Sequence, residues 1–101
     1  MSMFTLKLYI TGLTSKSERA ICNLRRICEE DLGGQCSLQI IDVLELPQLA
    51  EQDKILATPT LVKELPLPAK LVIGDLSDKD LVLHGLDMKP FATSVASGGS
   101  V

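Results

Sequence analysis

The residues with the most reactive side chains are three cysteines, Cys22, Cys28 and Cys36, and a histidine, His84. Thiols serve in redox exchange, in nucleophilic catalysis or as metal ligands, but each use needs partners at short spacing. The sequence has no Cys-x-x-Cys pair and no second histidine for a metal site. In a helix, Cys22 and Cys28 would lie about 9 Å apart along the axis, too far for a disulfide. The odd number of cysteines therefore predicts free thiols with a structural packing role.

No other grouping of residue types marks an active site. His84 lies among apolar residues, which favours a core or surface position over general-base catalysis. Asp42 comes at the end of an apolar run, where a carboxylate more often ends or caps a strand than acts as a buried acid. The glycine pairs at 33–34 and 98–99 lack the strand–turn–helix setting of a phosphate-binding loop. We therefore expect no catalytic residues, no cofactor and no metal.

Length and composition describe one small acidic domain. The chain has 101 residues, of which 46% are hydrophobic and only 3% aromatic, so the core must be aliphatic. A domain of this size buries little surface, which favours an oligomer. The net charge of −3 argues against nucleic-acid or anionic-membrane binding. No run approaches the roughly 20 apolar residues of a spanning helix, and no secretion signal is visible. These features predict a cytoplasmic protein.

The first half of the chain is predicted to form a β–α–β unit. Residues 4–10 alternate between apolar and polar, as a strand does. An apolar stripe at helical spacing follows, with Ser15 and Glu18 as a capping box and Gly33-Gly34 as the stop. Residues 38–44 form a second apolar strand. The intervening length fits a parallel pair with a right-handed helical crossover.

The second half gives weaker signals. A short helix from Pro47 to about Asp53, strands at 61–65 and 70–73, and a helix start at 77–80 are expected. The segment 81–86 fits a helix or a buried strand equally well.

The helical interpretation of residues 81–86 has a measurable penalty. Gly85 and the following Asp87 are poor helix formers and together cost roughly 1–2 kcal/mol relative to alanine. Such a conflict between local signals marks a strained or functional region.

This order of elements, with Thr58-Pro59-Thr60 before the third strand, follows the thioredoxin plan, in which a cis-proline occupies that place. Redox members of that plan need a low-pKa thiol at the start of the first helix. Here the loop at residues 11–17 offers hydroxyls instead, which argues against thiol–disulfide exchange.

Several stretches closely resemble the KaiB family of cyanobacterial circadian-clock proteins. They are Leu6-Lys7-Leu8-Tyr9, residues 41–44 (IDVL) and, most specifically, residues 47–61 (PQLAEQDKILATPTL). Residues 73–78 and 85–87 continue the resemblance in register.

The resemblance implies a metamorphic, thioredoxin-like α/β domain. We assign it to residues 1–91, followed by a flexible tail over residues 92–101. The resting form that the family adopts is a homotetramer with the order βαββααβ, and this is the form expected of the isolated chain. The alternative is a monomer with the thioredoxin-like order βαβαββα.

The resemblance also implies a function. The monomer of KaiB-like proteins binds the N-terminal ATPase ring of the KaiC hexamer, captures the KaiA activator and displaces a sensor histidine kinase that carries a KaiB-like domain. KaiC then passes from autophosphorylation to dephosphorylation, and KaiB catalyses nothing. We expect a non-enzymatic regulator of this kind. The alternatives are a thioredoxin-like oxidoreductase without a Cys-x-x-Cys pair and a stand-alone oligomeric binding module.

Matching positions carry family roles to single residues. Gly85 and Asp87 match positions at which replacement favours the switched fold. Pro59 matches a proline whose isomer is expected to differ between folds, and prolyl isomerisation is slow. Arg19 and Lys54 match basic positions on the side that faces KaiC.

The sequence also departs from the family. Leu71 replaces a family arginine, and we assign its neighbour Lys70 to partner binding. Ser15-Lys16 stands where Pro-Asn is usual, and the acidic C-terminal tail is absent. These departures indicate a divergent paralogue that serves a second KaiC-like ATPase.

Overall fold

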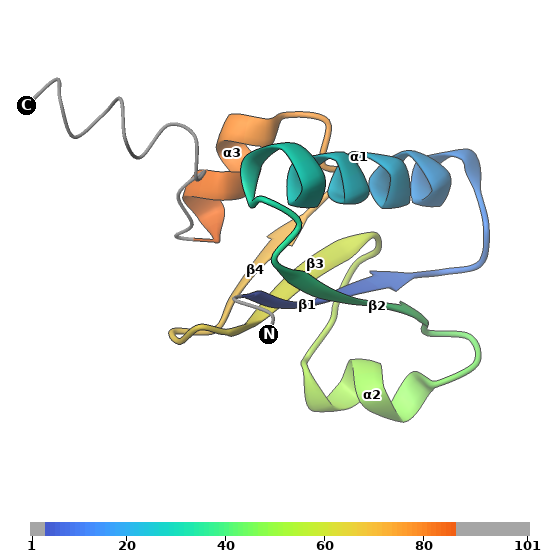
Figure 1. Ribbon diagram of the computed structural model, residues 1–101. Helices are drawn as coiled ribbons and strands as arrows, with labels where there is room; N and C mark the ends of the chain where they lie inside the picture. Colours follow the sequence, from blue (N-terminus) through green and yellow to red (C-terminus); the bar gives the residue numbers. More distant parts are fainter. Residues whose placement is uncertain (1–3, 87–101) are drawn as a thin grey trace, which may run out of the picture.

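The computed structural model describes residues 4–86, in which three helices pack on a four-stranded sheet (Figure 1). Asp87 and the tail at 92–101 lie outside these residues. The elements in chain order are β1 (Phe4–Ile10), α1 (Ser15–Asp31), β2 (Cys36–Asp42), α2 (Pro47–Gln52), β3 (Thr60–Leu65), β4 (Lys70–Ile73) and α3 (Lys79–Gly85).

The sheet has the strand order β2-β1-β3-β4. Strands β1 and β2 are parallel, with Phe4 opposite Cys36, which confirms the predicted β–α–β unit. Strand β2 begins two residues before the expected start at Leu38. Strands β3 and β4 form an antiparallel hairpin, and β3 pairs antiparallel with β1. This arrangement is the thioredoxin-like α/β fold that the sequence predicts.

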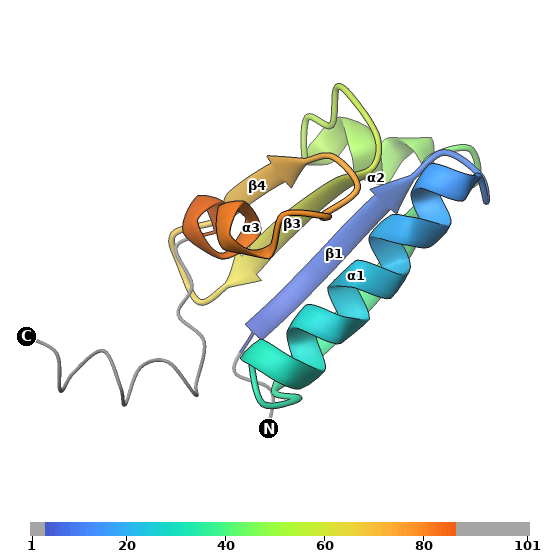
Figure 2. The same cartoon turned by 90° about the horizontal axis from the view of Figure 1, so that it is seen from above.

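The helices cover the two faces of the sheet unequally. Figure 1 shows α1 and α3 on one face and α2 on the other, and Figure 2 shows α1 running along β1 while α3 lies over β3 and β4. The main core lies under α1 and α3, and it is aliphatic apart from Phe4. A smaller core under α2 centres on Tyr9, Ile41 and Val62. Leu, Ile and Val side chains thus fill most of the core, as the low aromatic content of the sequence predicts.

Helix α1 begins at Ser15, one residue earlier than the predicted capping box implies. The hydroxyl of Thr14 accepts a hydrogen bond from the Ser17 backbone N–H at 3.1 Å, so Thr14 is the N-cap and Ser15 is the first helical residue. The predicted capping box centred on Ser15 is therefore wrong by one position. Thr14 serves because its extended backbone aims the hydroxyl at the free N–H groups of the first turn.

The order of elements is βαβαββα, the thioredoxin-like order. It differs from the order βαββααβ that was expected of the isolated chain. Residues 81–86 lie in and just after α3, where Asp78 caps the helix by accepting from the Leu81 N–H at 3.2 Å. Val82, Leu83 and Leu86 are buried in the main core. Burying each such side chain is worth about 1.5–3 kcal/mol, which outweighs the helical penalty of roughly 1 kcal/mol at a glycine.

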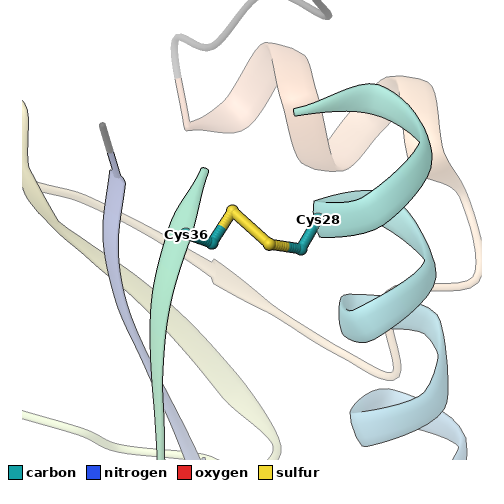
Figure 3. Close-up of a disulfide and its surroundings, with 2 residues drawn as sticks. All are labelled: Cys28 and Cys36. Carbon is teal, nitrogen blue, oxygen red and sulfur yellow. A yellow bond between two sulfur atoms is a disulfide. The ribbon is translucent and has the colours of Figure 1, made fainter. Parts of the chain in front are cut away.

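The prediction of three free thiols is wrong for two of them. Cys28 and Cys36 form a disulfide with their Cα atoms 6.1 Å apart (Figure 3). Cys22 is free and exposed. The pairing arises because the chain turns back between α1 and β2, through Gly33 and Gly34, which both have positive φ.

No helix among residues 4–86 is long and apolar enough to cross a membrane.

Candidate protein-contact site

Two of the three predicted partner-binding residues, Lys54 and Lys70, line the same hollow. It has a volume of about 430 Å³ and lies between the end of α2 and the start of β4. We call it the α2–β4 hollow. Its lining residues are Gln52, Asp53, Lys54, Val62, Ala69, Lys70 and Leu71. Lys54 lies just after α2 and Lys70 is the first residue of β4, and the thioredoxin-like order brings these two separate segments together.

The backbone after α2 fixes the position of Lys54. Asp53 is the C-cap, and Lys54 follows with a left-handed φ of 57°. The Lys54 N–H donates to the Glu51 carbonyl at 3.1 Å, and the next N–H, from Ile55, donates to the Ala50 carbonyl at 2.9 Å. Glycine usually occupies such a position, and another residue there costs on the order of 1 kcal/mol. This backbone geometry holds Lys54 at the edge of the α2–β4 hollow.

A polar network on the α2 face of the sheet holds the wall of the α2–β4 hollow. The buried Tyr9 hydroxyl donates to the Asp53 carboxylate and lies 3.3 Å from the Leu49 carbonyl oxygen. Lys7 Nζ lies 2.9 Å from Glu64 and 3.6 Å from Asp53. This network ties α2 to strands β1 and β3.

The same network sets the charge of the site. The hydrogen bond to Glu64 raises the pKa of Lys7, so the ammonium stays charged. Burial, followed by the bond to Asp53, raises the pKa of Tyr9, so the phenol stays neutral. Because Lys7 and Tyr9 engage the Asp53 carboxylate, the exposed Lys54 and Lys70 give the rim a positive character. Val62 and Leu71 supply apolar lining, so the site suits a partner surface with acidic and apolar groups.

Arg19, the third predicted residue, lies away from the α2–β4 hollow. It is in α1, on the other face of the sheet, with its Nε atom 3.5 Å from the Asp75 carboxylate. Asn23 donates from Nδ2 to the Asp75 backbone carbonyl at 2.8 Å. Hydrogen bonds from Ser77, and then the charge of Arg19, lower the pKa of Asp75. Arg19 thus helps to dock the β4–α3 connection on α1.

A further ion pair joins α1 to the start of α3. Lys79 Nζ lies 3.2 Å from Asp31 Oδ1, while the buried Oδ2 of Asp31 has no partner among the described residues. Sequence reasoning missed Asn23, Asp75 and this pair, because their partners lie more than forty positions along the chain.

The structure describes two of the three predicted fold-switch residues, Pro59 and Gly85. Pro59 is buried just before β3, and the Thr58–Pro59 peptide bond is cis, as the thioredoxin plan predicts. Gly85 is the last residue of α3, where an added Cβ atom would lie 2.8 Å from Val72 Cγ2 of β4. Asp87 lies outside the described residues, so its predicted role stays a prediction.

The place of a thioredoxin-type active site holds hydroxyls and backbone groups. Thr11 and Thr58 share a hydrogen bond of 2.6 Å between their Oγ1 atoms. Asp42 Oδ1 accepts from the N–H groups of Gly12 at 3.2 Å and Leu44 at 2.9 Å, which confirms its strand-end role. Within residues 4–86 no group of three or more His, Cys, Asp or Glu could hold a metal ion.

Comparisons with known proteins agree with the fold and add a family. Residues 7–88 match the KaiB domain. Circadian clock protein KaiB3 of Synechocystis sp. is 54% identical over 90 residues, which cover 89% of this chain and 88% of the relative. Circadian clock oscillator protein KaiB of Microcystis aeruginosa is 56% identical over 85 residues, covering 84% and 82%.

Solved structures with the same fold include a SasA domain and a thioredoxin. The N-terminal domain of Synechococcus elongatus SasA superposes with a TM-score of 0.70 at 26% identity and covers 86% of each chain. Mitochondrial thioredoxin 3 of Saccharomyces cerevisiae superposes with a TM-score of 0.67 at 15% identity, covering 86% of this chain and 79% of the other. At that identity the thioredoxin shows the fold alone.

Proposed function

The chain belongs to the KaiB family, and we propose that it is a non-enzymatic clock regulator that binds the N-terminal ATPase ring of a KaiC-type hexamer. Binding promotes the dephosphorylation phase of that ring. The observation that carries this proposal is the α2–β4 hollow, where Lys54 and Lys70 converge over apolar lining residues. Its charge favours an acidic protein surface as the partner.

The order of the elements after β2 supports a switch that gates this binding. The hollow needs α2, β3 and β4 in their present places, because its lining comes from all three and from the β3–β4 turn. A chain with the order βαββααβ would place these residues in other elements and would have no such hollow. Only the thioredoxin-like form is then competent to bind, so the population of that form limits the apparent affinity.

The surface also supports competition for the ring. The SasA domain has the same fold, so a competitor with that fold can present the same combination of strand edge and helix end. Capture of a KaiA-like protein and the resting homotetramer remain predictions. The similarity to KaiB3 supports a paralogue that works with a second KaiC-type ATPase.

A pull-down with the cognate KaiC-type ring, with and without ATP, tests this proposal. Lys54→Glu and Lys70→Glu should each weaken binding by about tenfold, which corresponds to about 1.4 kcal/mol. Arg25→Glu makes the same change of charge on the exposed surface of α1 and serves as the matched control. Far-UV circular dichroism must show that all three variants keep the wild-type secondary structure.

Two results would count against the proposed binding. If wild type fails to bind while it forms a tetramer, the protein is a stand-alone oligomeric module. If both lysine variants bind as well as the Arg25 control does, the hollow is not the contact surface.

A further inference from the structure

We propose that Cys28 and Cys36 form a reversible redox modification site, whose reaction partners are dithiol reductants and small disulfide oxidants. The site is separate from the α2–β4 hollow. The disulfide joins the last turn of α1 to the first residue of the edge strand β2, as Figure 3 shows.

The backbone holds the two cysteines together independently of the bond between them. The Gly34 N–H donates to the Cys28 carbonyl at 2.8 Å, and the Leu32 N–H donates to the Ile27 carbonyl at 3.2 Å. At the strand end, the Phe4 N–H donates to the Gln35 carbonyl at 3.0 Å. The resulting Cα–Cα distance of 6.1 Å falls in the range that a disulfide requires. The same backbone therefore fits both the dithiol and the disulfide, which a reversible site needs.

The surrounding charge favours the oxidised form. Catalytic redox thiols lie at helix N-termini, where the dipole stabilises the thiolate and so the reduced state. Cys28 lies at the opposite end of its helix, next to Glu29, Glu30 and Asp31, and the last turn carries no basic residue. Lys79 of α3 offsets only the Asp31 charge. Because the acidic end of α1 disfavours a thiolate and residues 4–86 offset only the Asp31 charge, the pair should resist reduction by monothiols and yield to a strong dithiol.

Exposure determines which sulfur reacts. Cys28 is 6% exposed, whereas Cys36 is partly exposed at the edge of the sheet. A reductant thiolate attacks Cys36 Sγ, the bond between the two cysteines breaks, and Cys28 leaves as a thiolate that takes up a proton. The second thiol of the reductant then attacks the reductant sulfur that is bonded to Cys36, and Cys36 is released as a thiol. Two electrons and two protons pass to the pair, and the reductant leaves as a disulfide. Glutathione disulfide reverses the reaction and leaves as two thiols.

Alkylation of the full chain at redox equilibrium tests the site. The folded protein is incubated with equal concentrations of reduced and oxidised glutathione, or with excess dithiothreitol, and free thiols are counted by mass spectrometry. We expect Cys28 and Cys36 to carry neither label nor glutathione in the glutathione buffer, where the exposed Cys22 carries one or the other, and we expect three labels in dithiothreitol. Three labels in glutathione would overturn the proposal, and so would one label in dithiothreitol.

Two variants separate the pair from the third thiol. Cys22→Ser should carry neither label nor glutathione in the glutathione buffer and two labels in dithiothreitol. In Cys36→Ser, both remaining thiols should carry either the label or glutathione in the glutathione buffer, and both should be labelled in dithiothreitol. During brief exposure of Cys22→Ser to reduced glutathione, acid trapping should find the glutathione adduct on the Cys36 peptide. An adduct on Cys28 instead would refute the route of attack.

Discussion

Replacing Gly85 by alanine tests how the contact between α3 and β4 affects the stability of the thioredoxin-like fold. Helix propensity alone predicts that alanine stabilises α3. The structure adds an opposing effect, because the new Cβ atom would lie 2.8 Å from Val72 Cγ2. Carbon atoms in contact normally stay about 3.5–4.0 Å apart. Val72 must therefore move, and its β-branched side chain has few alternative rotamers.

The two effects are similar in size. Alanine gains up to about 1 kcal/mol over glycine within a helix, and we take about half of this at the last residue of α3. An extra methyl group in a packed site costs about 1–3 kcal/mol, and we take the lower limit because Gly85 is exposed and Val72 only partly buried. In the wild-type background Gly85→Ala should therefore destabilise the fold by about 0.5 kcal/mol. In a Val72→Ala background the steric cost disappears, and Gly85→Ala should stabilise the fold by about 0.5 kcal/mol.

A double-mutant cycle measures this coupling. The wild type, Gly85→Ala, Val72→Ala and the double variant are unfolded in urea, followed by far-UV circular dichroism, at concentrations where size exclusion shows monomers. We expect a coupling free energy of about 1 kcal/mol between the two positions. A coupling below about 0.3 kcal/mol, with Gly85→Ala acting equally in both backgrounds, would refute the reasoning from the Val72 contact.

Three other changes have predictable effects on stability. Cys36→Ser should lower the free energy of unfolding by about 2.5 kcal/mol, because the disulfide closes a short loop in the unfolded chain. In urea melts, reductant should lower the stability of wild type to that of the variant. Equal stabilities of wild type and Cys36→Ser in oxidising buffer would contradict the prediction. Asn23→Leu leaves the Asp75 carbonyl without its donor and should cost about 1 kcal/mol in urea melts, whereas the exposed control Arg25→Leu should change stability by less than about 0.5 kcal/mol. Since folding raises the pKa of Tyr9, its contribution is complete below the ordinary tyrosine pKa of about 10 and is lost as the pH rises further. Tyr9→Phe should therefore lose less stability than wild type between pH 8 and pH 11, and equal losses would show that this phenol does not titrate with folding.

The first half of the fold is predictable because its signals are local. The alternation in residues 4–10 and the apolar stripe that follows specify a strand and a helix without reference to the rest of the chain. The α3 segment is different, because Gly85 opposes a helix locally while Val82 and Leu83 gain burial only once β4 and α1 are in place. Tertiary packing determines that this segment forms a helix, and local sequence signals could not distinguish the helix from a strand.

The sequence predicted residues of the candidate site but not how they lie together in the fold. Lys54 and Lys70 were assigned by family resemblance, and only the fold shows that they line one hollow. Arg19 was grouped with them, although its ion pair with Asp75 places it on the other face of the sheet. A long-range pair of this kind leaves no mark on local periodicity.

The disulfide had a weak signal that periodicity does not capture. Cys28 and Cys36 flank Gly33-Gly34, and a helix that ends at two left-handed glycines can turn its chain straight back. Reasoning that considered only cysteines within one helix excluded Cys22 with Cys28 and left this pair untested.

Backbone amide NMR of the perdeuterated chain, free and bound to its KaiC-type ring, tests the central claim most directly. The claim is that the thioredoxin-like arrangement of residues 47–86 is the form that engages the ring. It predicts strand chemical shifts for residues 60–65 and 70–73 and helical shifts for residues 79–85 in the bound state. A bound chain in which residues 79–85 show strand shifts would contradict the account. A chain that shows the predicted helical shifts at residues 79–85 but does not bind the ring would contradict it too.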